Sequence, residues 1–295
     1  MNGRFTREKL DQVLRQTCAR LGLDHRGATL LRFTNNAVYS LVNDPVVVRI
    51  VGSRALRHRA GKVVAVAEHF ARHEVPAIRL VAGVEQPLHI DEHVVTVWQK
   101  VPGTGTRATS AQLAVLLRQV HELPPPDGVG PWQPLADVRA RVSDAEELAP
   151  GDRRFLLERC REVEAELAEL EFVLPTALVH GDAHPGNVIV GDDGPVLCDF
   201  DSACAGPPEW DLVPLAVGRQ RFGDPSAWYR ALALTYGFDV TSWEGFGVLR
   251  AARELKLTTS VLPIMRSHPA VRRELRRRLE DLRAGRQHTR WVRYR

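Results

Sequence analysis

The chain contains 295 residues, of which 44% are hydrophobic, 26% charged and 6% aromatic. This composition excludes collagen-like, disordered and disulfide-stapled chains, and no stretch reaches the roughly 18 consecutive apolar residues of a membrane span. The four cysteines show neither a CxxC pair nor metal-finger spacing, and residues 1–9 lack the apolar core of a signal peptide. We therefore expect a globular, reduced protein in the cytoplasm.

Positive charge is concentrated in the last thirty residues of the sequence. The formal net charge is +4, yet residues 266–295 contain eleven arginines against three acidic residues, so the rest of the chain is mildly acidic. A basic helix of this kind is typical of a solvated face, and it can also bind nucleic acid or an anionic membrane. Because no nucleic-acid-binding signature accompanies it, we expect a solvated face, with neither nucleic acid nor a membrane as partner.

Short β-like runs dominate the first hundred residues. Apolar spacing predicts one helix over 6–21 and a second over 53–73. Strands are predicted over 28–33, 38–42, 46–51, 88–90 and 94–99. The sequence PGTG at 102–105 is typical of a linker, so we place a lobe boundary there.

Beyond residue 104 the pattern is mainly helical. Helices are predicted over 110–123, 135–148, 152–171, 209–222, 226–236, 243–265 and 270–284, with three short strands at 177–179, 188–190 and 196–198. The pattern therefore predicts an α+β protein in which a small β-rich lobe (1–98) is joined through 99–103 to a larger helical lobe (104–295).

The segment 180–201, HGDAHPGNVIVGDDGPVLCDFD, carries the chemistry. Asp-Asp-Gly at 192–194 predicts a turn between two strands, and the resulting hairpin returns Asp199 to the neighbourhood of Asn187. Asp182 lies five residues before Asn187 on the preceding loop. Hard oxygen ligands of this kind suit Mg²⁺, and Asp182 is then free to accept a proton from an attacking hydroxyl.

Three motifs in order, HGDAHPGN (180–187), CDFD (198–201) and WDL (210–212), resemble those of the aminoglycoside phosphotransferase and choline kinase-like superfamily. The resemblance covers nearly the whole chain and implies a protein-kinase-like two-lobed fold. It also implies transfer of the γ-phosphoryl group of ATP, or GTP, to a hydroxyl of a small molecule, with Mg²⁺ as cofactor. An aminoglycoside, another basic antibiotic and an amino alcohol are the acceptors we consider, and resistance, biosynthesis and salvage stay open as the purpose.

The same resemblance implies roles for single residues of the segment. Asp182 would be the catalytic base, and Asn187 and Asp199 would bind Mg²⁺. His180 would hold the loop in place, and Asp211 would support it from the following helix.

In the N-terminal lobe the resemblance implies nucleotide contacts. Residues 34–39, TNNAVY, fall where the family has a phosphate-facing turn, with Asn36 as the candidate contact, although an ordinary Asn-Asn turn explains the segment equally well. Arg49 stands where a kinase has its third-strand lysine, so we expect it to contact the α- and β-phosphates. Backbone groups of Gln99 and Val101 in the hinge 99–103 would bind adenine.

The partner of Arg49 is open in the sequence. A kinase pairs the corresponding cation with a glutamate on the following helix. Residues 54–67 contain no acidic residue and Glu68 comes late, so either Glu68 reaches Arg49 or the cation is held differently.

Two other functions stay open. His180, Asp182, His184 and Asp199 are also compatible with a metal-dependent hydrolase that uses zinc or manganese. A non-catalytic nucleotide-binding module with the arginine-rich tail as its contact surface is the third possibility. The sequence leaves the oligomeric state open.

Overall fold

The computed structural model describes residues 6–33, 36–52, 57, 59–265 and 268–294. The chain divides into two compact units. The first, which we call the sheet unit, comprises Met1–Ala108, Glu122–Gly130 and Pro185–Cys204, and the second, the helical unit, comprises Thr109–His121, Pro131–His184 and Ala205–Arg295. The segment with Asn187 and Asp199 thus belongs with the N-terminal sheet. Among the described residues, none of the helices has the length and apolarity needed to cross a membrane.

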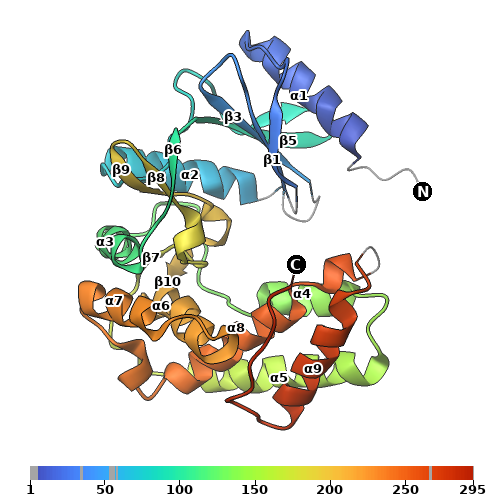
Figure 1. Cartoon of the computed structure of the whole chain (residues 1–295), viewed down its shortest axis with the longest axis vertical. Helices are drawn as coiled ribbons and strands as arrows, with labels where there is room; N and C mark the ends of the chain where they lie inside the picture. Colours follow the sequence, from blue (N-terminus) through green and yellow to red (C-terminus); the bar gives the residue numbers. More distant parts are fainter. Residues whose placement is uncertain (1–5, 34–35, 53–56, 58, 266–267, 295) are drawn as a thin grey trace. The chain divides into compact units, whose positions relative to one another are not determined.

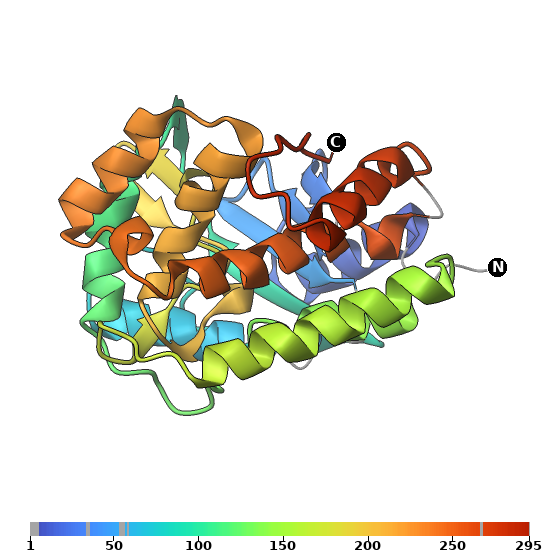
Figure 2. The same cartoon turned by 90° about the horizontal axis from the view of Figure 1, so that it is seen from below.

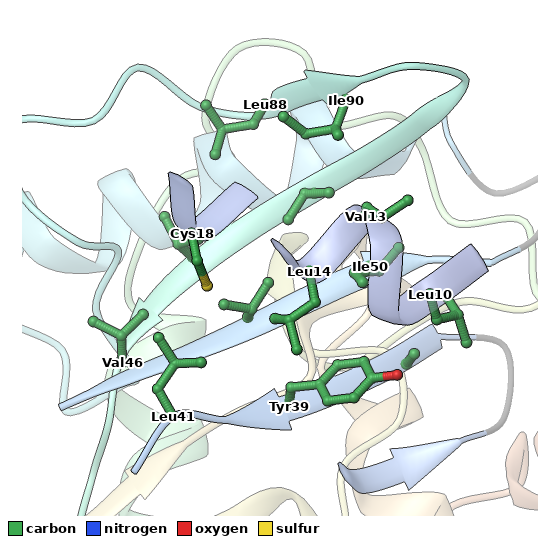
Figure 3. Close-up of a cluster of buried hydrophobic side chains, with 14 residues drawn as sticks. Leu10, Val13, Leu14, Cys18, Tyr39, Leu41, Val46, Ile50, Leu88 and Ile90 are labelled. Carbon is green, nitrogen blue, oxygen red and sulfur yellow. The ribbon is translucent and has the colours of Figure 1, made fainter. Parts of the chain in front are cut away.

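The sheet unit is built on a five-stranded antiparallel sheet in the order β1-β2-β3-β5-β4. The strands are β1 (Thr29–Phe33), β2 (Asn36–Ser40), β3 (Val46–Val51), β4 (Leu88–Ile90) and β5 (His93–Gln99). Helix α1 (Arg7–Leu21) begins at the N-cap Thr6 and lies along this sheet (Figure 1). Its apolar stripe packs on the sheet, and Figure 3 shows Leu14 of the helix beside Ile50 of β3. The predicted strand pattern of this lobe is confirmed.

Alternation along β3 decides which side chains reach which face. Val48 and Ile50 are fully buried in the cluster with α1, whereas Val51 packs with Ala60 of α2 (Arg59–Arg72). Because successive side chains of a strand point to opposite faces, Arg49 shares the face of Val51 and α2. The conformation of residues 53–56 and 58, at the start of the predicted helix, lies outside the described residues.

A second, three-stranded sheet completes this unit, in the order β6-β8-β9. It consists of β6 (Gly103–Arg107), β8 (Val188–Gly191) and β9 (Gly194–Leu197). The expectation of a linker at 102–105 is therefore wrong in its local structure. The segment is exposed and rich in glycine and threonine, yet it is a strand because β8, remote in the sequence, supplies its hydrogen-bonding partner.

The helical unit contains most of the remaining elements. Its helices are α3 (Ser110–His121), α4 (Ala136–Asp144), α5 (Pro150–Ala168), α6 (Glu209–Val217), α7 (Ser226–Tyr236), α8 (Phe246–Thr259) and α9 (Val271–Arg283). Strand β7 (Ala177–Val179) pairs with β10 (Cys204–Gly206), which begins at the unit boundary. Helix α8 packs against α4, α5, α6 and α9, and Figure 2 shows its long axis beside α5. It is therefore the central helix of this unit.

Several predicted helices are shorter than expected. The predicted helix 209–222 changes after Val217 into a π-helical turn, Gly218–Phe222. The predicted helix 243–265 begins at Phe246 and ends at Thr259, and a 3₁₀ turn, Leu262–Ile264, follows. Proline has no N–H to donate, so Pro263 does not continue the α-helical ladder.

The arginine-rich tail is only partly the solvated face that we expect from the sequence. Arg272, Arg273, Arg276 and Arg277 are exposed, but Arg278 has only 1% of its surface exposed. Its guanidinium lies 3.8 Å from the ring centroid of Tyr294 and donates to the carbonyl of Leu257 in α8. Planar guanidinium groups stack on aromatic rings, and residues 286–294 supply rings and carbonyls for this purpose.

Candidate active site

Arg49 is held by an acidic residue of the DFD segment, not by the helix that follows it. Its guanidinium forms an ion pair with the carboxylate of Asp201, and the Arg49 side chain is only 12% exposed. Burial by itself lowers the pKa of Arg49, but the charge and hydrogen bond of Asp201, together with the charge of Asp199, outweigh it and raise that pKa. The charge partner of Arg49, which the sequence left open, is therefore Asp201.

Two further side chains of the sheet unit fix the DFD segment. Asn36 donates through Nδ2 to the Asp201 carboxylate at 3.3 Å. Lys62 of α2 donates through Nζ to the carbonyls of Asp201 and Ala203, each at 2.8 Å. The predicted contact Asn36 thus lies in the same polar network as Arg49, while Thr34 and Asn35 of the predicted turn lie outside the described residues.

Apolar packing holds the same segment from the other side. Phe200 begins a short 3₁₀ turn, Phe200–Ser202, and is 1% exposed. Its ring packs edge-on against Phe70 of α2, with the centroids 5.2 Å apart, and lies 6.2 Å from the ring of Trp98 in β5. The phenylalanine anchors the turn in the core and leaves the flanking aspartates at its ends.

Asn187 and Asp199 flank the predicted hairpin. Val188 pairs with Leu197 at its open end, and the Cys198 N–H donates to the carbonyl of Asn187 at 2.9 Å. Asp199 has φ 67, in the left-handed region that costs strain in a residue other than glycine. Its carboxylate lies 3.1 Å from the Arg32 guanidinium. This pairing brings Asp199 back to the neighbourhood of Asn187, as the predicted hairpin requires.

The donor chemistry at this hairpin fits Mg²⁺. An Asp carboxylate and an Asn amide oxygen are hard oxygen ligands, and magnesium takes few protein ligands because it keeps water and phosphate oxygens. Asn187 is 4% exposed, so its amide is held in a fixed position rather than mobile in solvent. The strained Asp199 backbone is typical of a functional position.

The hinge segment leaves β5 at Gln99. The Gln99 N–H donates to the carbonyl of Arg79 at 2.8 Å, and the Lys100 N–H donates to the carbonyl of Pro45 at 2.8 Å. Gln99 is the last residue of β5 and Val101 follows two residues later, so both lie in the same unit as Arg49. Because the Gln99 amide is used by Arg79, an adenine contact at this residue has to use the carbonyl.

In the helical unit, Asp211 organises the loop that carries Asp182. The fully buried Asp211 carboxylate accepts from the His180 N–H at 2.6 Å and the Gly181 N–H at 2.7 Å. Gly181 has φ 81, a conformation that side-chain-bearing residues rarely adopt. The indole of Trp210 donates to the Gly181 carbonyl at 3.1 Å. Helix α6 therefore holds the peptide groups on both sides of Gly181.

His121 completes the anchor. Its Nε2 lies 3.0 Å from Asp211 Oδ2, and its Nδ1 lies 2.8 Å from the hydroxyl of Tyr236 in α7. The histidine at the end of α3 thus has a packed, hydrogen-bonded place between two helices. This contact joins α3, α6 and α7 at the base of the loop.

Asp182 lies among basic side chains of the same unit. Arg253 of α8 donates through Nη1 to Asp182 Oδ1 at 2.8 Å, and His184 Nε2 lies 3.9 Å from Oδ2. Lys256, one turn further along α8, lies with its Nζ 5.5 Å from the ring centroid of Trp210. Burial by itself raises the pKa of Asp182, but the charges around it, Arg253 first, hold the pKa well below its ordinary value.

The site residues predicted from the sequence thus fall into both units. Asn36, Arg49, Gln99, Val101, Asn187 and Asp199 belong to the sheet unit, and Asp182 belongs to the helical unit. Sequence reasoning missed Arg253 and Lys256. Their spacing of three residues on one helix is the signal that a search for a cationic helix face could have used.

The hydrolase alternative finds no support among the residues described. No group of three or more His, Cys, Asp or Glu side chains in that part of the chain is arranged to hold a metal ion. His180, with 1% of its surface exposed, is buried behind the loop whose peptide Asp211 holds. The histidine therefore fits the predicted structural role.

Comparison with known proteins identifies related sequences. Residues 31–251 match the model of the phosphotransferase enzyme family. A hydroxyurea phosphotransferase of Kitasatospora aureofaciens is 32% identical over 135 residues, which are 45% of this chain and 39% of that protein. The chain therefore aligns with well under half the length of this curated relative.

Solved structures share the fold at low sequence identity. A choline/ethanolamine kinase family protein from Mesorhizobium loti matches with a TM-score of 0.66 and 18% identity, over 93% of this chain and 94% of that one. The choline kinase LicA from Streptococcus pneumoniae matches with a TM-score of 0.68 and 16% identity, over 93% and 99%. The amicoumacin kinase hAmiN, in complex with AMP-PNP and Ca²⁺, gives 0.69 and 13%, over 96% and 98%. The predicted α+β, protein-kinase-like fold is confirmed.

Proposed function

This chain belongs to the phosphotransferase enzyme family, and we propose that it transfers the γ-phosphoryl group of ATP, or GTP, to a hydroxyl of a small molecule. The observation that carries the proposal is the Asp182 loop. Its peptide is fixed by a buried carboxylate, and it precedes a hairpin whose two ends bear Asn187 and Asp199. In protein kinases the catalytic base precedes the two metal ligands along the chain in this same order.

The chemistry assigned to this chain is proton removal and positioning. The acceptor hydroxyl donates its proton to Asp182 while its oxygen forms a bond to the γ-phosphorus. The bond from that phosphorus to the bridging oxygen breaks, and its electron pair leaves with the nucleoside diphosphate. General-base assistance of this kind contributes roughly 10²–10⁴-fold to the rate.

On the nucleotide side, the roles follow the polar network of the sheet unit. Arg49 is to contact the α- and β-phosphates, with Asn36 at the adjoining turn. The Gln99 carbonyl and the Val101 amide are to bind the nucleobase. Asn187 and Asp199 are to hold Mg²⁺, which when bound neutralises charge on the phosphates. Buried Arg49 suits this role because its charge is fixed and its fork matches phosphate oxygens.

The test is a coupled assay of nucleoside diphosphate release with Mg-ATP and a panel of small hydroxyl compounds. Acceptor-dependent release should fall at least 100-fold in Asp182→Asn, whereas binding of Mg-AMP-PNP should stay within a few-fold of the wild type. Asp199→Asn should lose Mg-dependent nucleotide binding as well. The exposed turn residue Asp193 provides the matched control, since Asp193→Asn removes the same charge from the same hairpin.

Wild-type turnover in Asp182→Asn would show that this residue is not the base. Thermal stabilisation by Mg-AMP-PNP without turnover of any acceptor would instead favour a nucleotide-binding module, the other possibility left by the sequence.

A further inference from the structure

Helix α8 presents two cations toward the Asp182 loop. Arg253 and Lys256 are three residues apart and therefore share one face of the helix. Arg253 is 9% exposed and bonds to Asp182, and Lys256 lies over Trp210, whose indole is bonded to the same loop. Arg253 therefore lies directly beside the carboxylate that an acceptor hydroxyl must reach, and Lys256 lies beside the tryptophan that anchors the same loop.

The positive charge at this position exceeds the negative charge. The charged groups that act on Lys256 are Arg253, Asp182, Asp137 and Arg141, of which the last two belong to α4. Together with Lys256 itself, this cluster contains three permanent or ammonium cations and two carboxylates. Burial, and then the charge of Arg253, lowers the pKa of Lys256 to about 8, because nothing nearby compensates the ammonium fully.

Arg253 also keeps hydrogen-bonding capacity in reserve. Its Nε is buried and makes no hydrogen bond to any of the residues that the structure describes. A buried N–H without an acceptor is unfavourable, and a bound ligand at a functional site can supply the missing acceptor. A negatively charged group would accept a hydrogen bond from the Arg253 Nε and would also neutralise the excess positive charge.

A small acceptor cannot avoid these cations. The hydroxyl oxygen has to come within about 2.6–3.2 Å of Asp182 to give up its proton, and Arg253 is already hydrogen-bonded to that carboxylate. An ammonium group on the acceptor would be repelled there, whereas a carboxylate or phosphate would form charge-assisted hydrogen bonds. The charge of this site therefore disfavours a polycationic aminoglycoside.

We propose that Arg253 and Lys256 bind an acidic group of the acceptor, so that the substrate is a hydroxyl compound bearing a carboxylate or phosphate. The proposal rests on the proposed function, because it takes Asp182 as the base. It assigns the two residues to substrate recognition rather than to the transfer step. When the acid group of the substrate takes over Arg253, it relieves Asp182 of that partner and leaves the carboxylate more basic.

Lys256 gives a direct readout, because the chain contains only four lysines. The experiment measures the rate at which acetic anhydride acetylates each lysine at pH 7.5, by mass spectrometry of the peptides. The probes are glycerate, malate and inorganic phosphate as anions, and kanamycin and choline as cations. Lys9 and Lys100 are internal references, since both lie in the sheet unit, outside the proposed site.

We expect millimolar anions to slow acetylation of Lys256 at least threefold without changing Lys9 or Lys100, and the cations to give no protection. In Arg253→Met the concentration of anion that protects should rise at least tenfold. Arg276→Met is the matched control, because Arg276 is exposed on α9 of the same unit and its loss should leave protection unchanged. Thermal melting of both variants checks that they are folded.

Two results would overturn the proposal. The first is that none of the anions protects Lys256 at millimolar concentration, or that kanamycin alone protects it. The second is that Mg-AMP-PNP protects Lys256 as strongly as the carboxylates do, which would assign the cations to the γ-phosphate. Turnover does not enter this readout, so failure of the proposed function would appear separately, as lost binding of Mg-AMP-PNP.

Discussion

The guanidinium of Arg253 lies 2.8 Å from the Asp182 carboxylate, although 71 positions separate the two residues in the sequence. The carboxylate that the family motif marks as the base is thus held in an ion pair by a helix from outside the motif. An aspartate held in this way has a lowered pKa and accepts protons poorly. If a bound substrate takes Arg253 away from Asp182, the pKa of Asp182 rises and the carboxylate becomes a better base, so substrate binding itself prepares the base.

Loss of the Asp211 carboxylate, which anchors the Asp182 loop, should lower the free energy of unfolding. In Asp211→Asn, one of the two loop N–H groups meets an amide NH₂ instead of a carboxylate oxygen, in a site with no exposed surface. We expect the free energy of unfolding to fall by about 2–4 kcal/mol, from the cost of unsatisfied buried polar groups. Urea denaturation measures it, and an unchanged midpoint would contradict the anchor.

The ion pair of Arg49 and Asp201 should show strong coupling. Asp201→Asn leaves Arg49 as a buried cation without its charge partner. We expect a loss of about 2 kcal/mol, below the roughly 3–5 kcal/mol of fully buried pairs because Asp201 keeps 28% of its side chain exposed. Adding Arg49→Met should restore part of the stability and still abolish nucleotide binding. Additive losses in a double-mutant cycle would exclude the coupling.

Lys256 should make stability depend on pH in the alkaline range. Its pKa is about 8 in the folded protein, below the 10.5 of a free lysine, so the folded state penalises the ammonium form. The penalty is complete below pH 8, decreases as pH rises, and disappears above 10.5, where the lysine is neutral in both states. Lys256→Met should therefore raise Tm at pH 7, with a smaller gain at pH 10. A gain that is independent of pH would refute the assigned cause.

The C-terminal segment should contribute to the core. Trp291 is 4% exposed and donates through Nε1 to the buried Asp281 at 2.9 Å. We expect Trp291→Ala to cost about 3–5 kcal/mol, as truncation of a buried aromatic does. The adjacent Val292 is 59% exposed, and Val292→Ala should stay within about 0.5 kcal/mol. Equal melting temperatures of the two variants would show that the segment is not packed in solution.

The parts of the site that sequence could supply are those that lie close together in the chain. Asn187 and Asp199 flank one hairpin, so local turn chemistry predicts that these two residues come together. The partner of Arg49 did not follow, because Asp201 lies 152 positions away and the kinase pattern directs attention to the next helix. What limits prediction of the site from the sequence is therefore the separation of interacting residues along the chain.

The fold shows the same limit. Periodicity predicted α1 and the strands β2, β3, β4 and β5, because each buries apolar side chains in one cluster. It misjudged residues 102–105, since glycine and threonine at exposed positions carry no periodic signal and the pairing strand β8 comes much later. It also read the terminal arginines as solvated, because burial of Arg278 depends on rings and carbonyls from other segments.

The docking of residues 286–294 has a consequence for how the helical unit is made. Arg221 donates to the carbonyls of Arg286 and Thr289, and its guanidinium lies 4.3 Å from the ring centroid of Trp291. A ribosome that has synthesised the chain only as far as α9 therefore holds a unit whose buried arginines lack these acceptors. The buried Arg221 therefore gains these partners only after residues 286–291 have been synthesised.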